Sequence, residues 1–214
     1  MNDQTFEQFP EDIWITAVPV ATVWTMPEKV RDMDRDGIAN PADIDRWLQG
    51  MDYNAKLSLC NENRVQTQLL YGEPVLVTGW QDGWASILIP SQPTNKNESG
   101  YPGWVPANQL KQVKKKDWAS AETAFVMDDK AWLEEEDGER FLKLSYLTSL
   151  PATGKKGNRI QLNTPNGIKL IDGATVSVCP SEQGLPGGSG QDIVRAGEAF
   201  IGLEYLWGHE FLRI

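Results

Sequence analysis

Alternating apolar and polar residues dominate the middle of the chain. In YGEPVLVTGWQDGWASILIP, residues 71–90, two alternating runs flank the turn residues QDG, an arrangement that is typical of a β-hairpin. The segment GYPGWVPANQL, residues 100–110, predicts a closing strand followed by a short turn. Short strands joined by glycine- and proline-containing turns predict a small β-barrel.

A second group of strand-like runs follows the first. It comprises ETAFVMDD, AWLEEEDGERFLKLSYLTSLP, RIQLNTPNGIKLI and GATVSVCP, with turns expected at EDGE and TPNG. These runs predict a second small barrel.

Other parts of the chain have the character of helices or of a linker. Between Trp24 and Asn63 the apolar residues recur with helical spacing, and PSEQGLPGGSG, residues 180–190, resembles a linker. A further helical pattern runs from Asp192 to about Ile201. We therefore predict a mainly β protein. Its parts are a first barrel with a helical insertion over 1–113, a second barrel over 114–180, a linker over 181–190, and the beginning of a third domain over 191–214.

Composition narrows the possible partners. The chain has 214 residues and a formal net charge of −10, which argues against nucleic acid as a partner. We find no secretory signal and no apolar stretch of membrane-spanning length, so we expect a cytoplasmic protein without a membrane partner.

Cys60 and Cys179 fit no metal spacing or redox motif, and we interpret both as buried or half-buried thiols.

One segment resembles a metal site. In DMDRDGIANPAD, residues 32–43, Asp32, Asp34, Asp36 and Gly37 stand at the first, third, fifth and sixth positions of a calcium loop. The twelfth position is Asp43, whereas a calcium loop normally has a glutamate that reaches the ion with both oxygens.

A turn and a helix explain the same residues. Asn40 could cap a helix, Pro41 suits its first position, Asp43 favours the N-terminal dipole, and Gly50 could end it. We therefore expect no metal and no cofactor, and leave calcium as the alternative.

Four segments resemble a known family. VQTQLLYGEPV, GWASILIPSQPTNKNESGYPGWVPANQL, FLKLSYLTSLP and AGEAFIGLEYLWG are similar to γ-D-glutamyl-L-diamino acid endopeptidases. These are bacterial NlpC-type cysteine peptidases with a papain-like catalytic domain and two N-terminal bacterial SH3 (SH3b) barrels. The resemblance implies two SH3-like barrels followed by the first helix of an α+β peptidase domain. It also implies substrates derived from peptidoglycan that carry a free N-terminal L-Ala.

The resemblance also implies roles for individual residues. Glu73 in YGEPV matches the acidic residue that meets the substrate ammonium, and Tyr101 in GYPGW matches the residue that reaches into the peptidase cleft. Tyr205 and Trp207, in YLWG at the entrance to the peptidase domain, are further candidate substrate contacts. A solvated turn carboxylate at Glu73 and a rim aromatic at Tyr101 remain open alternatives.

The end of the chain departs from the family pattern. In the family, YLWGG leads to a motif with the nucleophilic cysteine, but here His209 replaces the second glycine and EFLRI follows. We interpret this tail as a reading-frame shift, because one permitted coding of HEFLRI, read one base later, resembles the family's bridge to its catalytic motif. A mis-called gene or a deliberate truncation would leave a similar end.

Two functions follow from these observations. The first is the substrate-recognition part of a cytoplasmic endopeptidase that recycles peptidoglycan peptides, without the family's nucleophile and base. The second is a tandem SH3b module that binds wall peptides or a protein partner. The sequence leaves the oligomeric state, and the possibility of a separate peptidase chain, open.

Overall fold

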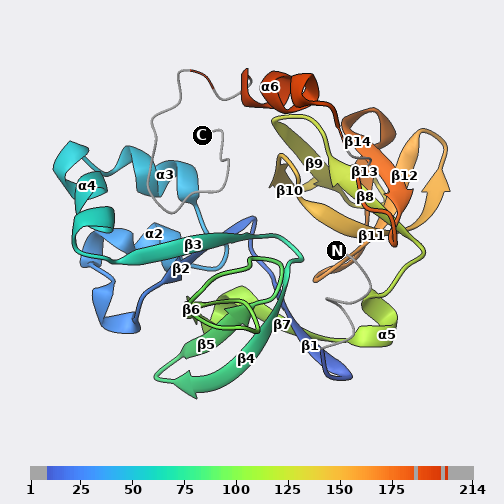
Figure 1. Cartoon of the computed structure of the whole chain (residues 1–214). Helices are drawn as coiled ribbons and strands as arrows, with labels where there is room; N and C mark the ends of the chain where they lie inside the picture. The colour runs from blue at the N-terminus through green and yellow to red at the C-terminus, as the bar shows by residue number, and fades with distance from the viewer. Residues whose placement is uncertain (1–8, 186–187, 199–200, 202–214) are drawn as a thin grey trace. The chain divides into compact units, whose positions relative to one another are not determined.

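The computed structural model describes residues 9–185, 188–198 and 201 (Figure 1). The described residues divide into two compact units, one spanning Phe9–Lys115 and the other beginning at Lys116. No described helix is long and apolar enough to cross a membrane.

The first unit is an antiparallel seven-stranded barrel. Its strands are β1 (Asp12–Thr16), β2 (Val20–Trp24), β3 (Val65–Leu70), β4 (Pro74–Gln81), β5 (Trp84–Ile89), β6 (Tyr101–Pro106) and β7 (Leu110–Lys114), with the 3-10 turn η3 (Ala107–Gln109) before β7. The strand order is β3-β2-β6-β5-β4-β1-β7. In β5, Ala85, Ile87 and Ile89 are buried while the residues between them are half-buried, as the alternating pattern of the sequence predicts.

The core of this barrel is aliphatic. Its buried members are Val18, Ala21, Val23, Leu69, Val75, Ala85, Ile87, Ile89, Val105 and Leu110. They come from both sides of the helical insertion in the sequence, so segments distant in the chain share one core.

That insertion connects β2 to β3 and has its own core. Its elements are η1 (Pro27–Lys29), η2 (Asp32–Asp34), α2 (Arg35–Ile38), α3 (Ile44–Gln49) and α4 (Tyr53–Asn61). Trp24, Trp47, Leu48, Met51, Leu59 and Val65 form a second buried cluster. Short helices of this kind are marginal alone, and the tryptophan cluster supplies the tertiary packing that holds them.

The predicted start of the α3 helix is wrong. Asp43, not Asn40, is the N-cap, and its side chain accepts a hydrogen bond from the Arg46 N–H. The Asn40 side chain instead donates to the Asn108 carbonyl. The helix does end at Gly50, as predicted.

The second unit repeats the barrel architecture. Its strands are β8 (Glu122–Val126), β9 (Lys130–Glu134), β10 (Arg140–Ser145), β11 (Ser149–Lys156), β12 (Arg159–Thr164), β13 (Gly167–Asp172) and β14 (Val176–Pro180), with α5 (Lys115–Trp118) before them and η4 (Gly173–Thr175) before β14. The order is β10-β9-β13-β12-β11-β8-β14, and all pairs are antiparallel. The prediction of a mainly β fold with two small barrels is therefore confirmed.

Among the described residues, one helix follows the second barrel. α6 (Gly190–Glu198) has no buried residue, and Ile193 and Val194 are 71% and 62% exposed. Its first turn is capped reciprocally, because Asp192 accepts from the Ser189 N–H and hydroxyl while the Asp192 N–H approaches the Ser189 hydroxyl. These hydrogen bonds from Ser189 hold the pKa of the Asp192 carboxyl below its ordinary value.

Candidate functional site

Glu73 lies in a tight turn between β3 and β4. The Glu73 N–H donates to the Leu70 carbonyl, which closes the turn, and Gly72 has a φ of 81°. A positive φ at the third position defines a type II turn and explains the glycine of the YGE motif. The Glu73 carbonyl accepts from both the N–H and the hydroxyl of Thr16, so the backbone of Glu73 is fixed to β1.

The Glu73 side chain is also held in place. One carboxylate oxygen, Oε2, accepts from the Leu70 N–H at 3.1 Å, and the other, Oε1, accepts from the Ser91 hydroxyl at 2.5 Å. The residue is half-buried. The turn therefore presents an oriented carboxylate rather than a freely rotating one.

The loop between β5 and β6, residues 90–100, is pinned onto β3. The buried side chain of Gln92 donates to the Gln68 carbonyl at 2.8 Å and accepts from the Thr67 hydroxyl at 2.8 Å. Ser91, the residue before it, reaches Glu73. This explains the SQ of the SQPT segment: one residue orients the carboxylate and the next anchors the loop.

Tyr101 begins β6 at the other end of the same loop. It pairs with Ile89 in β5. Gly100 before it has a φ of 128°, and a Cβ there would lie 2.2 Å from the Ile89 carbonyl oxygen, so only glycine allows the chain to enter β6 at this point. The Tyr101 hydroxyl donates to Gln66 Oε1 at 3.2 Å.

Lys96 joins this group from within the loop. Its Nζ donates to the Tyr101 hydroxyl at 2.9 Å, donates to Gln66 Oε1, and lies 4.6 Å from the centroid of the Tyr101 ring. Sequence reasoning assigned no role to Lys96, Ser91 or Gln66. The only available signal was their position in the motif segments that carry the family resemblance.

The structure thus brings two of the four predicted site residues to one loop. Glu73 contacts Ser91 and Tyr101 contacts Lys96, and both partners belong to the loop of residues 90–100. Tyr205 and Trp207 lie outside the described residues. Trp84 packs against the core of the helical insertion, and Trp104 pairs with Trp24 in the sheet, so both have packing roles in the barrel.

The aspartates of the calcium-like segment point to different partners. Asp34 is fully buried, whereas the Asp32 side chain is fully exposed and faces Arg35 at 3.7 Å. Asp36 pairs with Arg46 at 3.2 Å. Across the described part of the chain, no three His, Cys, Asp or Glu side chains are grouped so that they could hold a metal ion. Gly37, the sixth residue of the pattern, packs against the ring of Trp47.

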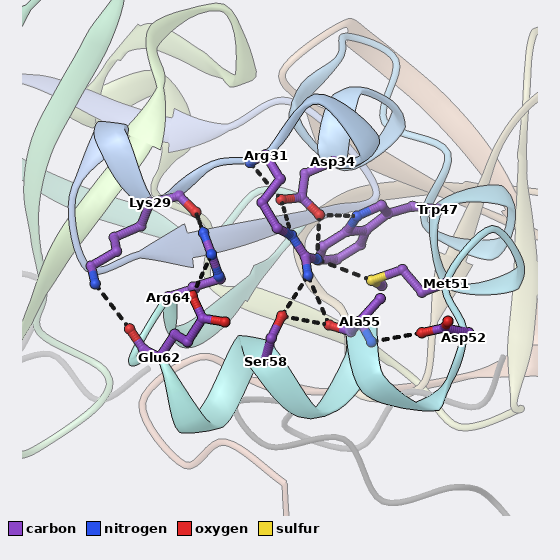
Figure 2. Close-up of polar contacts among 10 residues, drawn as sticks. All are labelled: Lys29, Arg31, Asp34, Trp47, Met51, Asp52, Ala55, Ser58, Glu62 and Arg64. Atoms are coloured by element: carbon purple, nitrogen blue, oxygen red, sulfur yellow. Dashed lines mark hydrogen bonds and ion pairs between the residues drawn. The ribbon is translucent and has the colours of Figure 1, made fainter.

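Figure 2 shows what Asp34 does instead. Its carboxylate accepts from Arg31 through Nε at 2.9 Å, Nη2 at 2.7 Å and the backbone N–H at 2.8 Å, and also from Trp47 Nε1 at 2.9 Å. The Arg31 guanidinium also donates hydrogen bonds to the Ala55 carbonyl and the Ser58 hydroxyl of α4. The Arg31–Asp34 pair therefore ties η2 to α3 and α4 and is structural.

The two cysteines belong to different units. Cys60 is half-buried in α4, and Cys179 is buried in β14, where its sulfur lies 3.6 Å from the Ser177 hydroxyl. The prediction of buried or half-buried thiols is confirmed for both. His209 lies outside the described residues.

Comparison with known proteins finds similar sequences and a similar structure. Residues 126–178 match the family model described as the YKFC SH3b2 domain. The gamma-D-glutamyl-L-lysine dipeptidyl-peptidase of Bacillus subtilis (strain 168) is 37% identical over 189 residues, which cover 88% of this chain and 62% of the relative. The protein with the same name from Bacillus cereus (strain ATCC 10987 / NRS 248) is 32% identical over 199 residues, which cover 89% of this chain and 58% of that relative.

A solved structure agrees with the sequence matches. The crystal structure of an NlpC/P60 family protein from Bacillus cereus ATCC 10987 superposes with a TM-score of 0.85 at 31% identity, over 92% of this chain and 66% of the other. This chain spans about three fifths of the length of the two curated relatives. By sequence and by fold, this chain is therefore similar to an NlpC/P60 family protein and to two gamma-D-glutamyl-L-lysine dipeptidyl-peptidases, and residues 126–178 of its second barrel match the YKFC SH3b2 domain.

Proposed function

We propose that the barrel over Phe9–Lys115 recognises peptidoglycan-derived γ-D-glutamyl peptides that carry a free N-terminal L-Ala. In this proposal the Glu73 carboxylate receives the peptide's ammonium group, and Tyr101 lines the same site. The observation that carries the proposal is the fixed orientation of the Glu73 carboxylate by Leu70 and Ser91. A pre-oriented carboxylate loses little entropy when it binds a cation.

The relatives support this choice of ligand. Both curated matches are named as gamma-D-glutamyl-L-lysine dipeptidyl-peptidases, and the YGE and GYPGW segments lie within the region that resembles their family. An enzyme that removes a dipeptide from an amino terminus has to distinguish a free ammonium from a peptide bond. A carboxylate is the side chain suited to that task.

The proposal assigns no catalysis to the described residues of this chain. Thiol catalysis requires a cysteine with a base within hydrogen-bond reach, whereas Cys60 and Cys179 lie in separate units and His209 is the only histidine of the sequence. We expect the purified chain to show no thiol-dependent hydrolysis of γ-D-glutamyl peptides. Turnover that iodoacetamide abolishes would contradict this part of the proposal.

Binding measurements test the recognition role. Calorimetry or NMR titration of the purified chain would compare L-Ala-γ-D-Glu-L-Lys with its N-acetylated form. A lost charge-assisted hydrogen bond costs about 1.5–3 kcal/mol, so N-acetylation should weaken binding by roughly tenfold or more. Glu73→Gln should weaken binding of the free peptide and make it insensitive to acetylation.

The matched control is Glu98→Gln, which removes an exposed carboxylate of the same loop and should leave binding unchanged. Equal binding of free and acetylated peptide would refute the assignment of Glu73. Failure to bind either peptide would refute the recognition function and favour a module for a protein partner. The cytoplasmic location remains part of the proposal, and cell fractionation tests it.

A further inference from the structure

Lys96 holds a positive charge among neutral groups. Within the described part of the chain, its ammonium contacts the Tyr101 hydroxyl, the face of the Tyr101 ring and the Gln66 side-chain oxygen. The Gln66 side chain is itself fixed, because its Nε2 donates to the Thr25 hydroxyl at 2.7 Å. These contacts orient the ammonium without neutralising it. An oriented cation of this kind suits an anionic ligand group.

Strand β3 carries the attachment points of both this cation and Glu73. The Glu73 carboxylate is bound to the N–H of Leu70, and Lys96 is bound to the side chain of Gln66. Both residues belong to β3 and are four positions apart. At about 3.3 Å per residue, the two attachment points are separated by about 13 Å along the strand.

The same distance can be worked out for the proposed ligand. In an extended L-Ala-γ-D-Glu-L-Lys, standard bond lengths place the terminal carboxylate about 12 Å from the N-terminal nitrogen. The α-carboxylate of the D-Glu residue is only about 6 Å from that nitrogen. The spacing along β3 therefore fits the carboxylate of the third residue and not that of the second.

We infer that Lys96 is a specificity-determining residue that binds the free carboxylate of the diamino acid in a γ-D-glutamyl tripeptide. The inference rests on the proposed function, because Glu73 fixes the other end of the ligand. It makes the site selective for a tripeptide that ends at the diamino acid. A longer peptide, or one whose third residue is amidated, lacks that carboxylate.

The test compares L-Ala-γ-D-Glu-L-Lys with the same peptide carrying a C-terminal amide. NMR titration of the full chain should show weaker binding of the amide by about fivefold, equivalent to about 1 kcal/mol at 25 °C and typical of an exposed ion pair. Lys96→Met should bind both peptides alike while still discriminating against the N-acetylated peptide. The control Lys111→Met, at an exposed lysine of β7, should behave as the wild type.

The outcomes separate the inference from the proposed function. If Lys96→Met keeps the wild-type preference for the free carboxylate, or the wild type has no such preference, the inference is overturned while discrimination by Glu73 can still stand. If N-acetylation has no effect on the wild type, the proposed function fails and the inference fails with it. A preference that is abolished by Lys96→Met and kept by Lys111→Met supports the inference.

Discussion

Replacing Asp34 with alanine tests the structural interpretation of the calcium-like segment. The Asp34 side chain is 0% exposed and that of Arg31 is 16% exposed. The substitution removes every hydrogen bond that Arg31 and Trp47 make to the carboxylate in Figure 2. The guanidinium keeps the Ala55 carbonyl and the Ser58 hydroxyl but loses its counter-charge.

The expected cost follows from this burial. Removing one partner of a buried ion pair destabilises a protein by about 3–5 kcal/mol, because the remaining charge is buried without compensation. A typical domain has about 5–15 kcal/mol of stability in total. The change should therefore remove a large share of the stability of the helical insertion. Adding Arg31→Met to Asp34→Ala removes the buried charge that has lost its partner. The double variant should therefore be more stable than Asp34→Ala alone.

Native-state hydrogen exchange of α3 and α4 measures the effect where it arises. Asp34→Ala should lower the free energy of opening in these helices by about 3 kcal/mol or more. Asp32→Ala is the matched control, because its exposed pair with Arg35 should contribute no more than about 1 kcal/mol. Protection in Asp34→Ala within about 1 kcal/mol of the wild type would refute the claim that the buried pair holds the insertion together.

Three further results follow from the structure. Calcium up to millimolar concentration should leave the melting temperature unchanged, and a saturable rise that Asp34→Ala abolishes would show that the segment binds the ion. A chain ending at Leu185 should keep the wild-type melting temperature of the barrels, since no residue of α6 is buried; unfolding of either barrel would make α6 part of the fold. Asp192 has a lowered pKa, so its support of α6 should be present above its ordinary pKa and lost as pH falls below about 4. Helix protection followed by NMR should decline there, and an unchanged profile, or the same profile in Ser189→Ala, would contradict the capping role.

The fold was predictable where the determinants are local. The β4–β5 hairpin closes at Asp82 and Gly83, whose φ angles are 46° and 81°, and two positive φ values are what a two-residue hairpin turn requires. The QDG turn and the alternation on either side of it are contained in one short segment. The same holds for the glycine of the Glu73 turn.

The missed features depend on contacts between distant segments. Asp34 fits a calcium loop and a buried ion pair equally well until Trp47, thirteen residues away, is packed beside it. Lys96 lies in a polar loop with no periodicity. It contacts Gln66, thirty residues earlier in the chain, in a loop that Gln92 anchors on β3. Asn40 has the chemistry of a helix cap, but Asp43 takes that role because the helix begins three residues later than the sequence pattern indicated.

The crystal structure of the chain in complex with L-Ala-γ-D-Glu-L-Lys would test the central claim most directly. The account predicts the N-terminal ammonium of the peptide within about 3 Å of the Glu73 carboxylate, with the peptide running along β3 toward Tyr101. A peptide bound at another surface, for example on the barrel over β8–β14, with Glu73 making no contact to its ammonium, would contradict the account.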